Sequence, residues 1–320
     1  MKIQMKKMIK VALLVPVLLI GFVSLGYSKD QILVGYVQVG EGSSWRFANS
    51  HSMKDAADAA GFQLIERKGA TFAEQTKQID YFINQQVDAI AVAPIQSDGW
   101  DTILKEAQKE NIPVIIMDRA ITADKSLYLT YIGADMNLEG QMAANWVLKK
   151  FADKTGPIKL VELRGMEGST PAIHRHEGFM QVISKNNKFV IAQSQAGDFN
   201  TAKGKEVMAN ILKAENGLVD VVYAHNDDMA MGAIEAIKEY GKKPGKDIII
   251  ISIDGMKTAF EAMVKGDMNA TIECTPLLGP YLMQAIKDHL AGKDVPKWVM
   301  TTKDLYSQDI AAKELPLRKY

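Results

Sequence analysis

The stretch QILVGYVQVGEGSSWRFANS, residues 31–50, contains the local pattern from which the fold of this chain can be derived. Its first part, residues 32–39, is apolar and rich in β-branched residues, which predicts a buried strand. A helix is expected over about residues 45–60, because Gly61 is the residue type that most often stops a helix. A strand followed directly by a helix is the repeating unit of α/β proteins.

The same alternation of strand and helix continues along the chain. Further apolar runs predict buried strands at residues 89–93, 113–117, 158–163, 219–224 and 248–253. Helical patterns lie near residues 72–86, 98–110, 137–152, 171–185, 201–215, 227–240 and 277–291. Because the strand runs are apolar without alternation, they suit parallel strands that helices cover on both faces. The predicted fold class is therefore α/β.

A short internal repeat indicates that there are two such sheets. Glu41-Gly42-Ser43-Ser44 follows the first predicted strand, and Glu167-Gly168-Ser169-Thr170 follows the strand that begins at Ile158. The identities are few, but further short matches occur in the same order in both halves of the chain. Two Rossmann-like lobes with parallel sheets are expected.

The N-terminal segment and the overall composition limit the class of protein. Residues 1–28 have the charged, apolar, small-residue order of a secretory signal peptide, with cleavage expected near Ser28; an uncleaved anchor is the alternative. Without this leader, the 38 basic and 38 acidic residues become 34 and 38, a net charge of −4. Such a chain has no electrostatic attraction to nucleic acid or to anionic membranes. Cys274 is the only cysteine, so an intramolecular disulfide is excluded.

Polar and aromatic side chains gather where the predicted strands end. Ligands of open α/β sheets bind outside the carboxyl ends of the strands, so these residues are candidates for a binding site. They are Trp45, Arg46, Asp118, Arg119, Arg175, Asn226 and Asp254. An aromatic ring can stack on the apolar C–H face of a sugar, while carboxylates, guanidinium groups and an amide can bind its hydroxyls. The set therefore suits a monosaccharide.

Each of these residues also has an ordinary structural interpretation. Asp118 or Asp254 could cap a following helix, and Asp118 and Arg119 could form a weak local ion pair. Trp45 could be a core aromatic residue. Arg46 is harder to explain in this way, because neighbouring side chains on a helix point in different directions and it would need its own partner. Their joint position at strand ends favours the binding site.

We find no motif that predicts catalysis, a metal or a cofactor, and none of these is expected. Gly40-x-Gly42 lacks the third glycine of a dinucleotide fingerprint. His174 and His176 are two residues apart and would point away from each other on a helix. Asp227 and Asp228 are interpreted as complements of a helix dipole. Asp118 and Asp254 could form the carboxylate pair of a glycosidase, but the arginines beside them favour ionised acceptors over a general acid.

Several stretches resemble the type 1 periplasmic sugar-binding proteins of ABC importers, the ribose-binding-like group. The resemblance covers nearly all of residues 31–310, and VYAHNDDM is most similar to the galactofuranose-binding branch. The stretches are VDAIAVAP (87–94), IPVIIMDR (112–119), VELRGMEGSTPAIHRHEGF (161–179), QSQAGDFNTAKGKEVM (193–208), VYAHNDDMAMGAIEAIK (222–238) and SIDG (252–255).

The resemblance implies two lobes joined by a three-segment hinge. The N-terminal lobe would comprise residues 29–135 plus 275–301, and the C-terminal lobe residues 136–274 plus 302–320. The hinge crossings would lie near residues 135–137, 273–276 and 300–303.

The resemblance also implies roles for individual residues. Asp118, Arg119, Arg175, Asn226 and Asp254 would bind hydroxyls, and Trp45 would stack on the ring. Arg46 stands where ribose binders have a second aromatic residue, and Cys274 where they have glutamine, which argues against ribose as the ligand. Arg46 would instead donate to the exposed hydroxyls of a furanose tail. Weaker candidates for the site are Ser44, Glu41 and Glu273.

The expected function is that of an exported, monomeric protein that captures a monosaccharide and delivers it to an ABC permease in the membrane. Galactofuranose is the first choice of ligand, with arabinose, ribose or galactopyranose as alternatives, and the expected location is the periplasm. A periplasmic sensor that passes a sugar signal to a membrane kinase or chemoreceptor is the second hypothesis. A sugar-responsive transcription regulator would share the fold, but it needs a DNA-binding headpiece where the leader stands.

Overall fold

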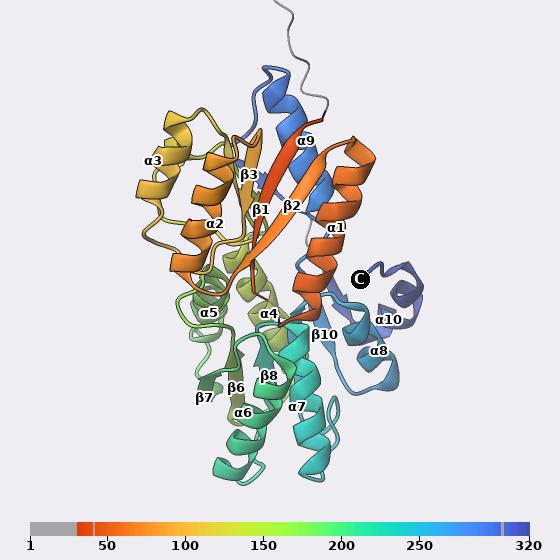
Figure 1. Cartoon of the computed structure of the whole chain (residues 1–320). Helices are drawn as coiled ribbons and strands as arrows, with labels where there is room; N and C mark the ends of the chain where they lie inside the picture. The colour runs from red at the N-terminus through yellow and green to blue at the C-terminus, as the bar shows by residue number, and fades with distance from the viewer. Residues whose placement is uncertain (1–30, 41, 302–303) are drawn as a thin grey trace, which may run out of the picture. The chain divides into compact units, whose positions relative to one another are not determined.

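Residues 31–40, 42–301 and 304–320 are described by the computed structural model and form two six-stranded sheets (Figure 1). The first sheet has the strand order β11-β5-β4-β3-β1-β2, and all its neighbouring strands run parallel. Its strands are β1 (Leu33–Val39), β2 (Gln63–Gly69), β3 (Ala89–Val92), β4 (Val114–Met117), β5 (Thr130–Gly133) and β11 (Trp298–Met300).

The second sheet repeats this arrangement. Its order is β12-β10-β9-β8-β6-β7, and only the pair of β10 and β12 is antiparallel among the described strands. Its strands are β6 (Ile158–Arg164), β7 (Phe189–Ala196), β8 (Val221–Ala224), β9 (Ile249–Asp254), β10 (Ala270–Glu273) and β12 (Leu305–Ser307). The order 2-1-3-4-5 of the first sheet thus recurs as 7-6-8-9-10. The predicted α/β fold with two parallel sheets is confirmed.

Helices cover both faces of the first sheet. On one face α1 (Ser44–Ala60) packs against α9 (Gly279–Leu290), as Figure 1 shows, and on the other α2 (Phe72–Asn84) packs against α3 (Asp101–Lys109). Strand β1 explains this arrangement, because Val34 and Tyr36 belong to the core beneath α1, whereas Val37 belongs to the core beneath α2. A strand that is apolar on both faces needs such a cover on each side.

The second sheet is covered in the same way. On one face α4 (Met136–Lys150) packs against α5 (Thr170–Ile183), and on the other α6 (Thr201–Ala214) packs against α7 (Asp227–Glu239). The remaining elements are α8 (Lys257–Lys265), α10 (Gln308–Glu314) and the short turns η1 (Lys125–Leu127) and η2 (Leu315–Leu317). Within the described ranges, no helix has the length and apolar character needed to cross a membrane.

The first helix begins immediately after β1 for local reasons. The Ser43 hydroxyl accepts a hydrogen bond from the Arg46 backbone N–H at 3.2 Å and caps the helix. At the other end Gly61 adopts a left-handed conformation with φ of 73°, so the predicted stop at Gly61 is confirmed. Trp45 and Arg46 therefore stand in the first turn of α1, directly beyond the carboxyl end of β1.

The chain passes three times between the two sheets and their helices. It does so from β5 to α4, from β10 to α9, and from β11 to β12. The last passage includes residues 302–303, which lie outside the described residues, as does the predicted leader at residues 1–28.

Several elements were not predicted from the sequence. The missed strands are β2, β5, β7, β10, β11 and β12, and the missed helices are α8 and α10. Strands β2 and β7 lie at sheet edges, where one side meets solvent, so they contain residues such as Glu66, Arg67 and Gln193 and lack a continuous apolar run. The other missed strands have three or four residues and the two missed helices have nine and seven, and such short elements carry too little pattern to be recognised.

Candidate functional site

All seven residues selected at the strand ends line one cavity between the two sheets. Its volume is about 80 Å³. The first sheet and its helices contribute Trp45, Arg46, Asp118 and Arg119, whereas Arg175, Asn226 and Asp254 come from the second. The cavity is also lined by Val39, Gly40, Gly42, Ser43, Met166, Pro171, Asp198, Phe199 and Cys274. Two halves of the chain therefore meet at a surface rich in charged and aromatic groups.

Arg46 and Asp118 form an ion pair in the wall of the cavity that the first sheet and its helices contribute. The guanidinium of Arg46 donates through Nη2 to the Asp118 carboxylate, and through Nη1 to Gln38 Oε1 at 3.3 Å. Asp118 has a left-handed backbone with φ of 62°, which is uncommon for a residue other than glycine. The Tyr131 hydroxyl donates to the Asp118 carbonyl at 2.9 Å and supports this turn. Arg46 thus has the partners that the sequence required.

Trp45 is buried and is fixed in position by a hydrogen bond. Its indole Nε1 donates to the Cys274 carbonyl at 2.6 Å, and only 5% of the residue is exposed. The Arg46 guanidinium lies 4.7 Å from the centroid of the Trp45 ring, so the two neighbours share one stacked unit. The expectation that Arg46 would point away from Trp45 is therefore wrong, because the first turn lets the arginine fold back over the ring.

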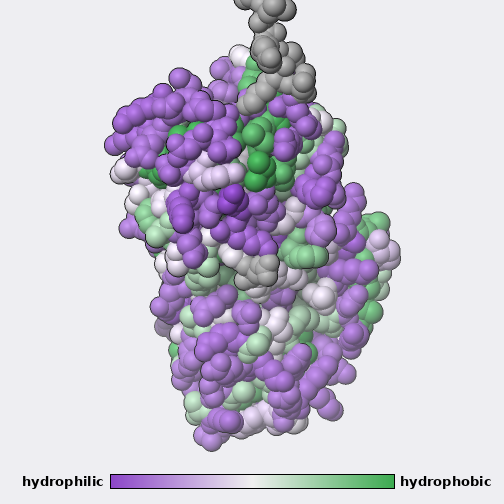
Figure 2. All heavy atoms as spheres, in the orientation of Figure 1, coloured by the Kyte–Doolittle hydropathy of each residue, from purple (hydrophilic) through white to green (hydrophobic). Residues whose placement is uncertain are grey.

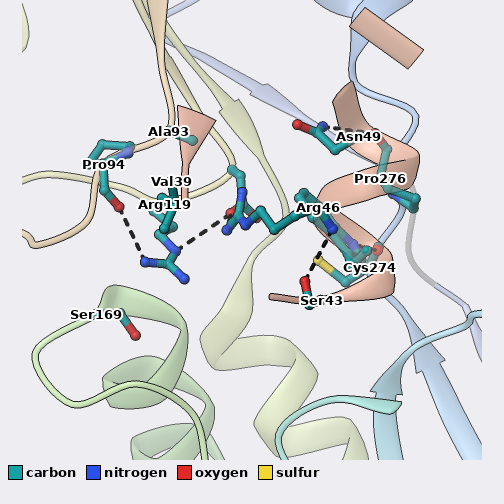
Figure 3. Close-up of polar contacts among 12 residues, drawn as sticks. Val39, Ser43, Arg46, Asn49, Ala93, Pro94, Arg119, Ser169, Cys274 and Pro276 are labelled. Carbon is teal, nitrogen blue, oxygen red and sulfur yellow. Dashed lines mark hydrogen bonds and ion pairs between the residues drawn. The ribbon is translucent and has the colours of Figure 1, made fainter. Parts of the chain in front are cut away.

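Arg119 lies deeper in the same wall. It is buried, and its Nη1 lies 3.5 Å from the Pro94 carbonyl, as Figure 3 shows, and 3.5 Å from the Ile95 carbonyl. Its Nε lies 3.8 Å from Asp118 Oδ2 and has no hydrogen-bond partner among the described residues. Burial and the nearby Arg46 lower the pKa of Arg119 to about 9. A buried donor without a partner is costly, and an acceptor entering the cavity would satisfy it.

Arg175 makes several polar contacts in the wall of the cavity that the second sheet and its helices contribute. Its Nε donates to Glu139 Oε2 at 2.9 Å, its Nη1 donates to the His225 carbonyl at 2.6 Å, and Nη2 lies 3.9 Å from Asp254 Oδ1. Burial alone would lower the pKa of Arg175, but the carboxylates of Glu139 and Asp254 hold it above the ordinary value. The guanidinium is therefore a permanent cation at the floor of the cavity.

Asp254 differs from the expectation that nearby arginines keep it ionised. Burial raises its pKa well above the ordinary value, the attraction of Arg175 opposes this, and Asp227 and Asp228 add to the rise. At 3.9 Å Arg175 is too distant to donate a hydrogen bond. The Asp254 backbone φ is 135°, a conformation that side chains rarely adopt.

Neither aspartate has the capping role that was the ordinary alternative. The N-cap of α8 is Met256, which makes no side-chain cap, and Asp118 is followed by no helix before η1. Asn226 is the residue that caps a helix, because its Oδ1 accepts from the Met229 N–H at 3.0 Å. Its Nδ2 is 3.4 Å from the Phe199 carbonyl. Asn226 can therefore offer a donor to a ligand, whereas its acceptor is already engaged.

Of the weaker candidates, Glu273 and Ser44 do not line the cavity. Glu41 is outside the described residues. Glu273 accepts hydrogen bonds from Arg318 at 3.2 Å and from the Tyr320 hydroxyl at 2.7 Å, and thereby fastens the C-terminal segment. Ser44 contacts Asp228 of the opposite half instead of lining the cavity.

Asp198 and Phe199 are two of the lining residues that were not predicted from the sequence. They follow the end of β7 after Gly197, so the rule of strand ends would have found them had β7 been predicted. The Arg119 Cζ lies 5.7 Å from the Phe199 ring centroid, so an aromatic ring of the second half lies beside an arginine of the first. Gly165 makes this position possible, because a Cβ there would overlap the Phe199 ring.

Two of the three histidines in the second half, His176 and His225, share one carboxylate. Glu162 bonds His176 Nδ1 and His225 Nε2, each at 2.9 Å. Burial lowers the pKa of His225, while the bond to Glu162 raises that of His176. Among the described residues, no group of three His, Cys, Asp or Glu side chains is placed to hold a metal ion.

Comparison with known proteins gives a consistent result. Residues 34–294 match the model of the family described as periplasmic binding protein domain. The galactofuranose-binding protein YtfQ of Escherichia coli is 42% identical over 293 residues, which cover 90% of this chain and 92% of that protein.

Two solved structures are similar at comparable levels. A Mycobacterium smegmatis protein in complex with β-D-fucofuranose has a TM-score of 0.86 and 44% identity, over 89% of this chain and 94% of that one. The periplasmic component of the arabinose ABC transporter from Shewanella sp. ANA-3, bound to α- and β-L-arabinofuranose, has a TM-score of 0.86 and 44% identity, over 90% and 95%.

Proposed function

Because the chain belongs to the periplasmic binding protein family, we propose that it captures a monosaccharide in its furanose form and delivers it to an ABC permease. Galactofuranose is the first choice of ligand. The observation that carries this proposal is the single cavity in which charged and aromatic residues from both halves converge. Capture and release need no chemical step, so the proposed role is binding and not catalysis.

The ligands named for the relatives support a common furanose ring. Galactofuranose, fucofuranose and L-arabinofuranose have the same configuration at ring carbons 2 to 4 and differ only in the tail beyond the ring. In this chain Asp118 and Asp254 would accept from ring hydroxyls, and Arg119, Arg175 and Asn226 would donate to them. Arg46 would bind the tail beyond the ring. Ribose binders have a second aromatic residue at this position, and its flat ring would leave no room for such a tail.

The cavity also supports a closing motion. Its walls come from both sheets, so a sugar that bonds to both would favour the conformation in which they are close. In this proposal the N-terminal lobe is residues 29–135 plus 275–301, and the C-terminal lobe is residues 136–274 plus 302–320. The protein would be exported by cleavage near Ser28 and would act as a monomer in the periplasm.

The test measures the binding of free sugars to the mature protein. Calorimetry gives the affinities, and NMR with D-galactose labelled at carbon 1 gives the ring form that is bound. D-galactose, D-fucose and L-arabinose should bind, while D-glucose, which has almost no furanose form in water, should not. The bound label should resonate at the furanose position. A bound pyranose signal would overturn the furanose assignment, and failure of all sugars to bind would overturn the sugar-binding proposal.

A further inference from the structure

A buried row of side chains connects the cavity with the segment that passes from β10 to α9. The Asp118–Arg46 ion pair is continued by Gln38, whose Oε1 accepts from Arg46 Nη1 at 3.3 Å. Gln38 Nε2 donates to Asn49 Oδ1 at 3.0 Å, and Asn49 Nδ2 donates to the Pro276 carbonyl at 2.9 Å. We refer to Gln38 and Asn49 as the amide relay.

The orientation of both amides is determined by additional partners. Gln38 Oε1 also accepts from the Val39 N–H at 3.0 Å, and Asn49 Oδ1 also accepts from the Tyr36 hydroxyl at 2.6 Å. Gln38 is 2% exposed and Asn49 is 1% exposed, so water cannot replace these bonds. Rotation of either amide would place donors against donors. The relay therefore has one favourable arrangement, and in it an acceptor faces Arg46.

A second contact leads to the same segment. Trp45, the other neighbour in the first turn of α1, donates to the Cys274 carbonyl at 2.6 Å. Figure 3 shows Asn49 reaching Pro276 from α1, with Arg46 and Cys274 close by. Both adjacent residues of the cavity wall are thus connected to residues 274–276. This segment belongs to one of the three passages between the sheets.

We propose that Gln38 and Asn49 are positioning residues of the sugar site, which hold Arg46 in place relative to residues 274–276. The inference rests on the proposed function, because it assigns the relay to the binding of a sugar by Arg46. Neither amide lines the cavity, so both act through Arg46 and not through contact with the ligand. Movement of residues 274–276 and the orientation of Arg46 are coupled by this row.

The first test compares Asn49→Ala with a matched control, Asn269→Ala. Asn269 is also buried, with Nδ2 donating to the Gly245 carbonyl and Oδ1 accepting from the Ile250 N–H, both at 2.9 Å. It lies in the second half and does not line the cavity. Both variants should lose stability, but only Asn49→Ala should weaken binding of D-galactose and L-arabinose, by about tenfold. Equal affinity for the two variants would overturn the proposal.

A second test separates positioning from general loss of packing. In an Arg46→Met background the relay has nothing to position, so Asn49→Ala should change the affinity by less than about threefold. Gln38→Met, which keeps the volume and removes the amide, should behave in the same way. Additive losses in the double variants would contradict the inference.

A measurement without sugar distinguishes failure of this inference from failure of the proposed function. The same Arg46 and Asn49 variants are unfolded with urea, and the equilibrium constants are combined in a double-mutant cycle. A coupling of more than about threefold is expected, since the two residues share one network. If the wild-type protein bound none of the sugars, the proposed function would fail; a coupling near one would overturn the relay itself.

Discussion

Ser44 and Asp228 stand 184 positions apart in the sequence, yet the Asp228 carboxylate accepts hydrogen bonds from both the backbone N–H and the hydroxyl of Ser44, each at 2.9 Å. Ser44 opens α1 beside the first sheet, and Asp228 lies in the first turn of α7 beside the second. The carboxylate therefore interacts with the positive ends of two helices at once. This contact connects the two halves beside the cavity without lining it.

Asp228→Asn should weaken sugar binding while leaving the fold intact. The amide oxygen can still accept from the Ser44 N–H and the NH2 group can donate to the Ser44 hydroxyl oxygen, so the main loss is the negative charge at two helix N-termini. We expect affinity for L-arabinose to fall about three- to tenfold, by calorimetry. The radius of gyration without sugar should rise in small-angle scattering. Asp101→Asn, at the exposed start of α3, is the matched control. Unchanged affinity would show that the contact is dispensable.

Asp254→Asn should bind sugar less well, and its free energy of unfolding should change less with pH. An acid whose pKa is higher in the folded state holds an extra proton between the unfolded and folded values. The free energy of unfolding therefore falls as pH rises above about 4, and the amide removes this part of the decline. Asp227, whose pKa burial raises to about 7, retains its own part.

The measurement is urea unfolding between pH 4 and 8 for the wild type and Asp254→Asn. The two curves should diverge as pH rises, with the variant the more stable at pH 8. Affinity for D-galactose should fall about two- to tenfold, the usual loss for one hydrogen bond between uncharged groups. Parallel stability curves would contradict the assigned pKa direction.

Gly165→Ala should displace the aromatic ring that the sequence analysis missed. The added methyl group would overlap Phe199, so the ring would move within the cavity or the strand would shift. We expect a stability loss of about 1–3 kcal/mol, as for other overpacked sites, and an affinity loss of about tenfold. Gly35→Ala is the control, because Gly35 lies beneath Phe82 in the same manner but away from the cavity. A similar affinity for both variants would remove Phe199 from the site.

Sugar binding should change the tryptophan fluorescence of the protein, and Trp45→Phe should abolish this change. Trp45 is the one of the four tryptophans that lines the cavity. Its phenylalanine variant also loses the bond to the Cys274 carbonyl, at a cost of about 1 kcal/mol in stability. Trp100→Phe is the control, because the fully buried Trp100 donates to the Gln96 carbonyl at 3.0 Å and does not line the cavity. A sugar response that survives in Trp45→Phe would assign the signal elsewhere.

Much of the fold was predictable because its central strands are buried on both faces. Continuous apolar runs identified β1, β3, β4, β6, β8 and β9 within about two residues. Edge strands such as β2 and β7 were missed, since their solvent side admits charged residues. The loss of β7 removed Asp198 and Phe199 from the candidate site, which shows how an error at one strand carries over to the residues after it.

The sequence by itself determined the fold class and the seven strand-end residues, because burial imposes local patterns and parallel strands present their carboxyl ends together. Tertiary structure alone decided how those residues pair. The ion pair of Arg46 with Asp118, the bond from Asn49 to the Pro276 carbonyl and the contact of Ser44 with Asp228 join positions far apart in the chain. Such contacts depend on distances and orientations that folding creates, and no local pattern encodes which polar group will face another.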